Sequence, residues 1–67
     1  MDKMKRLIEK ARQLNEEIKA EVVNRENYFS ERSENWQDSV KGDEYSATTE
    51  ALNELADMID EGLSGIE

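Results

Sequence analysis

The predicted fold depends on one short stretch, Ser39-Val40-Lys41-Gly42-Asp43-Glu44-Tyr45. Gly42 is the first glycine in a chain of 67 residues that contains no proline. Glycine readily takes the left-handed conformation that closes a helix, and lysine suits the negative C-terminal end of a helix. Asp43 is a suitable N-cap for a following helix. The stretch therefore predicts that one helix ends before Gly42 and that another begins directly after it.

Upstream of this stretch, apolar residues recur at helical spacing with no glycine or proline among them. We therefore predict one long helix over about residues 3–40. The rival prediction is a kink or break between Asn24 and Ser33, where weak helix formers gather. The sequence alone leaves both possibilities open.

Downstream, a second apolar stripe predicts a shorter helix over about residues 43–63. It is carried mainly by Tyr45, Leu52, Leu55, Ile59 and Leu63. A turn at Gly42 would fold this helix back on the first. The expected fold is thus all-α, an antiparallel helical hairpin forming a single domain over residues 1–67.

The two predicted helices differ in length, which leaves residues 1–17 uncovered. That part of the chain opens the cleanest heptad seam, in which apolar residues alternate steps of three and four: Met4, Leu7, Ala11, Leu14 and Ile18. A chain this small has a marginal core, and without Cys or His it has neither a disulfide nor the usual structural zinc site. We therefore predict a homodimer held by these five residues, as a coiled-coil-like bundle of helices.

Charge is distributed unevenly along the chain. The net charge of the chain is −8, yet residues 1–20 carry a net charge of +2. The charged side chains of residues 50–67 are all acidic. In a dimer, the basic arm would come near the acidic helix of the neighbouring chain. Basic residues interleaved with acids are a poor footprint for nucleic acid, so we expect no direct binding to it. No apolar run approaches the length of a membrane span, and we expect a cytoplasmic protein without a membrane partner.

The residue types argue against an enzyme and against a cofactor. There is no His or Cys, and no glycine-rich phosphate loop. Asp57, Asp60 and Glu61 share one helical turn, where a hard cation is conceivable. A solvated acidic helix face is the better interpretation, because no calcium-binding loop is present. We expect neither catalytic residues nor a metal site.

Four aromatic residues gather around the predicted turn: Tyr28, Phe29, Trp36 and Tyr45. The first interpretation is a hydrophobic plug between the helices, with Trp36 at least half buried. The second is a binding hot spot for another protein, because Trp and Tyr supply large contact areas in such patches. We keep these four as candidate partner-binding residues.

The segment from Asn27 to Ser39, Asn27-Tyr28-Phe29-Ser30-Glu31-Arg32-Ser33-Glu34-Asn35-Trp36-Gln37-Asp38-Ser39, is followed by Lys41-Gly42-Asp43-Glu44-Tyr45. Over these residues the chain resembles short uncharacterised helical proteins of tailed bacteriophages and prophages. The resemblance implies a phage setting and a host protein as partner. It implies no activity.

Two functions remain from the sequence. The first is a small non-enzymatic protein–protein interaction module that dimerises and presents an acidic surface with aromatic residues at its tip. The alternative is an acidic DNA mimic that inhibits a nucleic-acid-binding or defence protein, since residues 21–67 carry a net charge of −10.

Overall fold

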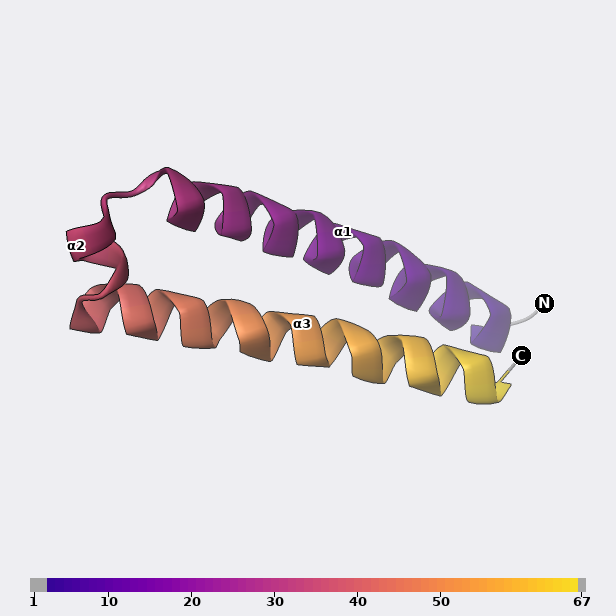
Figure 1. Cartoon of the computed structure of the whole chain (residues 1–67). Helices are drawn as coiled ribbons and strands as arrows, with labels where there is room; N and C mark the ends of the chain where they lie inside the picture. Colours follow the sequence, from indigo (N-terminus) through magenta and orange to yellow (C-terminus); the bar gives the residue numbers. More distant parts are fainter. Residues whose placement is uncertain (1–2, 67) are drawn as a thin grey trace.

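The computed structural model describes residues 3–66, so Met1, Asp2 and Glu67 of the predicted domain lie outside the described residues. Three helices follow one another: α1 (Lys3–Glu31), the short α2 (Glu34–Gln37) and α3 (Val40–Ile66). The long helices lie side by side and antiparallel, and α2 lies in the turn between them (Figure 1). This confirms the predicted all-α antiparallel hairpin. We call the end that contains α2 the turn end, and the other the open end.

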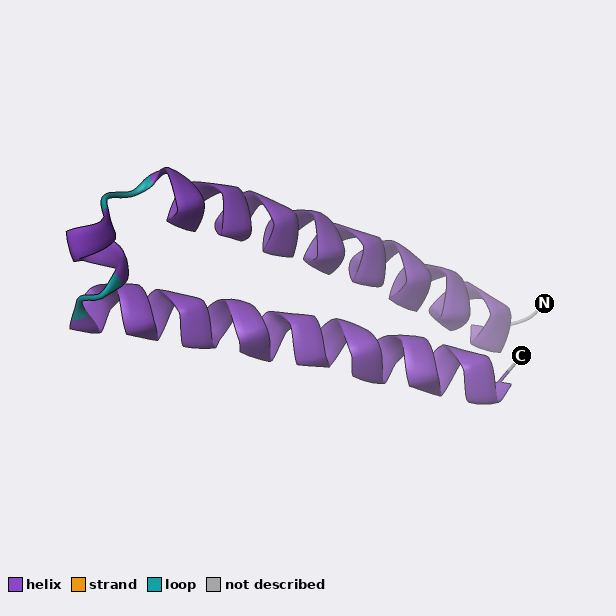
Figure 2. Ribbon diagram, in the orientation of Figure 1, coloured by secondary structure: helices purple, strands orange, loops and turns teal. Residues whose placement is uncertain are grey.

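The predicted helix boundaries are wrong. The first long helix ends at Glu31 rather than at residue 40, and the second runs from Val40 to Ile66 rather than over 43–63. The break lies at Arg32 and Ser33, inside the segment from Asn24 to Ser33 that the rival prediction named. Figure 2 shows loop at this point and again just before α3.

Side chains rather than a glycine build the break. Ser33 is the N-cap of α2, with an extended backbone, and its Oγ accepts a hydrogen bond of 3.3 Å from the backbone N–H of Trp36. The Gln37 side chain donates through Nε2 to the carbonyl oxygens of Phe29 at 2.9 Å and Arg32 at 3.1 Å. The last carbonyls of a helix have no partner within it, so Gln37 supplies the missing donor where α1 ends.

Gly42 has a different role from the predicted one. It lies inside α3, it is buried, and among the described residues no glycine has a positive φ. A Cβ at this position would lie only 2.5 Å from the carbonyl oxygen of Gln37 and 2.8 Å from its carbonyl carbon. The glycine therefore lets the backbone of α2 pack directly against the first turn of α3.

The two long helices meet along a seam that steps by three and four residues in each helix. In heptad terms, the seam holds positions a and d, while positions e and g flank it on opposite sides. Every seam residue is buried or half-buried. The seam residues are Ile8, Ala11, Asn15, Ile18, Val22, Arg25 and Phe29 in α1, and Gly42, Tyr45, Thr49, Leu52, Ala56, Ile59 and Leu63 in α3.

The predicted overhang of residues 1–17 is also wrong. The long helices have 29 and 27 residues, so they cover each other along nearly their whole length. Asn15 and Lys19, at the edge of the predicted overhang and just beyond it, both contact Asp60 of α3. Within the described residues, no long end of α1 therefore extends beyond α3, and the exposed apolar residues lie along the side of the hairpin.

Candidate interaction surface

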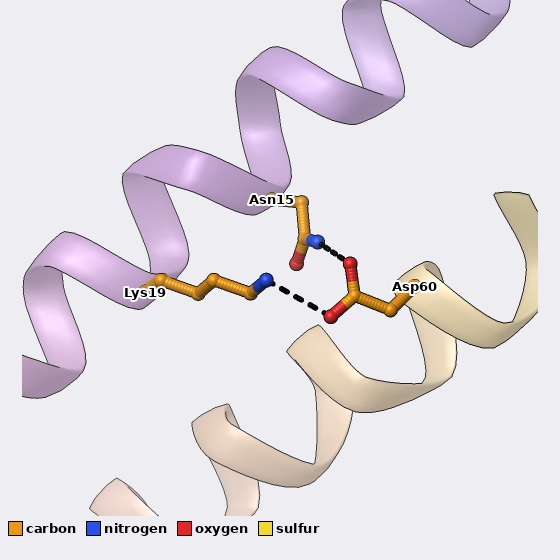
Figure 3. A network of polar contacts seen from close by, with 3 residues as sticks. All are labelled: Asn15, Lys19 and Asp60. Atoms are coloured by element: carbon orange, nitrogen blue, oxygen red, sulfur yellow. Dashed lines mark hydrogen bonds and ion pairs between the residues drawn. The ribbon is translucent and has the colours of Figure 1, made fainter.

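One side of the seam is polar. Its e positions are Arg12, Lys19 and Glu26 in α1, and Ser46, Asn53 and Asp60 in α3. On this side Asn15 Nδ2 donates to Asp60 Oδ1 at 2.6 Å, and Lys19 Nζ lies 2.9 Å from Asp60 Oδ2 (Figure 3). The hydrogen bond from Lys19 is the main cause that lowers the pKa of Asp60 below its ordinary value of 3.8. Desolvation opposes it, and the charge of Lys19 and the hydrogen bond from Asn15 add to it.

Asn15 makes this network incomplete. Its side chain is only 4% exposed, and within the described residues its Oδ1 accepts no hydrogen bond. Burying an unpaired acceptor costs about 1–3 kcal/mol. The network therefore fixes how the helices align at a cost in stability, as a polar residue at a seam position often does.

The opposite side of the seam carries large exposed apolar side chains in the half toward the open end, whereas toward the turn end its g positions include Glu21, Thr48 and Lys41. In an antiparallel pair the g positions of both helices flank the seam on the same side, and the c positions lie next to them. Leu7 and Leu14 at g positions of α1 are 55% and 53% exposed. Leu55 at a g position of α3 is 42% exposed, and Met58 at a c position is 61% exposed. We call these four residues the apolar face.

The structure divides the five residues of the predicted dimer interface. Ala11 and Ile18 are half-buried in the seam against α3. Leu7 and Leu14 lie on the apolar face, and Met4 is exposed near the start of α1. Leu55 and Met58 of α3, which the sequence-based set omitted, complete the surface. Their signal is visible in the sequence, because α3 has apolar residues on a wider arc than a two-helix seam requires.

The structure brings the four predicted aromatic residues together at the turn end. The Trp36 ring lies 6.0 Å from the ring of Tyr28, 5.8 Å from that of Phe29 and 5.7 Å from that of Tyr45, measured between centroids. Trp36 is half-buried, as predicted, although it lies in α2 rather than on the long helix. Tyr28 is the most exposed of the four, at 45%. This geometry favours the plug over a free binding patch.

Arg25 was not recognised from the sequence as a seam residue. Its guanidinium lies 3.9 Å from the centroid of the Tyr45 ring. Its Nε donates to Thr49 Oγ1 at 2.9 Å, and its Nη2 donates to the Tyr45 carbonyl oxygen at 3.1 Å. Arginine can pack flat on an aromatic face and still donate at its edge, so it can occupy a half-buried seam position beside Tyr45. The signal in the sequence was its spacing, because Arg25 follows Val22 by three residues, as a seam residue would.

Two further kinds of site are not found in the described part of the chain. Within residues 3–66, no three His, Cys, Asp or Glu side chains are grouped so that they could hold a metal ion. In the same range, neither long helix has an apolar stretch long enough to cross a membrane.

Comparisons with protein-family models, with curated proteins and with solved structures find no match to this chain. The resemblance of residues 27–45 to short phage proteins stays a prediction.

Proposed function

We propose that this chain is a small non-enzymatic protein–protein interaction module, and that the apolar face is its binding surface. One observation carries the proposal: large apolar side chains of α1 and α3 lie exposed on the same side of the seam, while the other side is polar. An exposed apolar patch that spans two elements is typical of a site for another protein. A single exposed leucine would need no such explanation.

The thin core of the hairpin supports the same proposal. Among the described residues, Val22 and Ala56 are the buried apolar side chains, and they share the interior with the polar Asn15 and Thr49. Covering one large apolar side chain contributes about 1.5–3 kcal/mol. A partner on the apolar face would therefore add stabilisation comparable with that from the core itself.

A matched pair of variants tests the proposal. The double variant Leu14→Glu, Met58→Glu places two charges on the apolar face, whereas Val23→Glu makes the same kind of change at a 54% exposed position on the other side of α1. With tagged protein as bait in the cells that express it, we expect the double variant to lose its bound protein. Val23→Glu should retain it. Equal capture by both, with helicity preserved, would refute the proposal.

The resemblance to phage proteins makes a host protein the partner to look for first. A captured protein other than a second copy of this chain should then be one encoded by the bacterial host. Its binding should withstand moderate salt, because an apolar interface depends little on screening.

An acidic DNA mimic is the second candidate, and a ridge on α3 favours it. The exposed residues Glu50, Glu54, Asp57 and Glu61 follow in steps of four, three and four along the outer surface of the helix. No basic residue occurs in α3 after Lys41. Such a partner would be displaced by duplex DNA and by salt. Changing Glu54 and Asp57 to their amides would abolish binding of this partner. The Leu14→Glu, Met58→Glu variant would bind it as well as the unmodified chain does.

A further inference from the structure

The single hairpin exposes more surface than a compact protein of its mass. Its accessible surface is 5363 Å², whereas a folded monomer of 7.8 kDa is expected to expose about 4,400 Å². The excess, on the order of 1,000 Å², is close to the roughly 800 Å² that each partner buries in a stable interface. A side of the hairpin 53 Å long and 16 Å wide has room for such an interface. The excess exposed surface of the hairpin is thus comparable in size with half a dimer interface.

A second copy of the same hairpin has the shape to cover this surface. Two antiparallel helices form one flat layer, and two such layers stacked through their apolar sides form a four-helix bundle. A twofold dimer uses the same patch on both copies, so it needs a patch that is complementary to itself. The apolar face meets that requirement at one level of the hairpin: because Asn15 contacts Asp60, Leu14 of α1 and Met58 of α3 lie at similar levels on the same side of the seam.

Charge selects between the two ways of stacking the layers. At the open end, the edge of the apolar face is basic along α1, with Lys3, Arg6 and Lys10, and acidic along α3, with Glu61. A twofold axis parallel to the helices places α1 of one copy on α3 of the other, with Lys10 within about one turn of Glu61 of the second copy. An axis across the helices would instead place α3 on α3, acid against acid.

We infer that the apolar face is covered by a second copy of this chain, with the twofold axis parallel to the helices, so that α1 of each copy packs on α3 of the other. The inference rests on the proposed function and names its partner. Leu14 of one copy then packs beside Met58 of the other. The charged edges fix the orientation and add little affinity, because exposed ion pairs are weak.

Sedimentation equilibrium of the full chain tests the dimer. We expect a mass of twice 7.8 kDa at tens of micromolar, and a monomer for the Leu14→Glu, Met58→Glu variant. Val23→Glu should remain a dimer. If the unmodified chain is a folded monomer, the inference is overturned. The proposed function would still stand if capture of a different protein depended on the same two residues.

Charge exchange tests the orientation without disturbing the fold. Within one hairpin Lys10 and Glu61 lie on opposite edges, so any coupling between them reports on the second copy. Lys10→Glu and Glu61→Lys should each weaken the dimer by a few-fold, and the two changes in one chain should restore it. Additive weakening would overturn the proposed orientation.

Cross-linking gives an independent measure of the same arrangement, since the chain has no cysteine of its own. We expect a Lys10→Cys chain mixed with a Glu61→Cys chain to form the mixed disulfide on mild oxidation, because the two positions face each other across the edge of the bundle. Neither variant should cross-link when alone. Ready cross-linking of Glu61→Cys to itself would show α3 on α3 and would overturn the inference.

Discussion

The turn end and the open end of the hairpin are held in different ways. At the turn end, the rings of Tyr28, Phe29, Trp36 and Tyr45 touch one another, and Gln37 caps α1. Toward the open end, Asn15 of α1 contacts Asp60 of α3, and Met4 and Ile66 are 65% and 60% exposed. The comparison teaches that the aromatic side chains at the turn end pack on one another, whereas large apolar side chains toward the open end stay exposed. The proposed partner would cover exposed apolar side chains of the open half.

The largest effect is expected from breaking the ring cluster. Trp36→Ala should lower the free energy of unfolding by about 3 kcal/mol, near the lower end for such truncations because the ring is only half-buried. Chemical denaturation followed by circular dichroism measures this loss. Val40→Ala, at a position that is 74% exposed, should change the same quantity by less than about 0.5 kcal/mol. Similar losses in the two variants would contradict the role of the cluster.

Two glycines on the same helix sharpen the comparison. Gly42→Ala should cost about 1–3 kcal/mol, because its Cβ would press on the backbone of α2, which cannot move aside as a flexible side chain can. Gly62→Ala, toward the open end, has nothing within 4 Å of the added Cβ and should stabilise the helix by about 0.5–1 kcal/mol. Thermal melts of both variants at equal concentration give the comparison. Opposite signs are the expected outcome.

The buried amide at the start of the open half gives a smaller effect. Asn15→Leu removes the unpaired Oδ1 and should raise the free energy of unfolding by about 1 kcal/mol. Asn15→Asp should lower it instead, because a second carboxylate would face Asp60. If Asn15→Leu proved destabilising, the hydrogen bond to Asp60 would be worth more than the cost of the unpaired oxygen.

The smallest effect concerns pH. Because the pKa of Asp60 is lower in the folded chain than in the unfolded chain, folding favours the ionised carboxylate. Its contribution is complete above the ordinary pKa of 3.8 and is lost as the pH falls through the lowered folded value. Asp60→Asn lacks this contribution, so the stability difference between the two proteins should narrow on acidification. Lys19 and Asp60 are both about half exposed, so salt screens their ion pair. Added salt should therefore also narrow the stability difference between the two proteins.

The fold class could be predicted from the sequence, because two long periodic stripes in a chain without proline leave few alternatives to a hairpin. The turn could not be placed, because the prediction relied on glycine chemistry at Gly42. The chain instead ends α1 with the side chains of Ser33 and Gln37, which are common residues with no distinctive spacing. Gly42 allows close packing inside a helix. The local sequence does not distinguish a glycine with this role from one that ends a helix.

The candidate surface was predicted in part, for a reason that lies in the heptad pattern of α1. Two seams share Ala11 and Ile18 and keep the same steps. The more apolar one runs through Leu7 and Leu14, whereas the seam that forms runs through Asn15 and Arg25. Hydrophobicity alone favours the first. Only the specific contacts of Asn15 with Asp60 and of Arg25 with Tyr45 show why the second is used.

The position of the turn also orders the contacts by the length of chain that each one closes. The bond from Gln37 to Phe29 spans 8 residues, that from Arg25 to Thr49 spans 24, and that from Asn15 to Asp60 spans 45. Closing a longer loop costs more conformational entropy. Folding should therefore begin at the aromatic rings and proceed toward the chain ends. Amide hydrogen exchange should be fastest near the chain ends and become progressively slower toward the turn end. The half of the molecule that offers the apolar face is then the last part to form and the first to open.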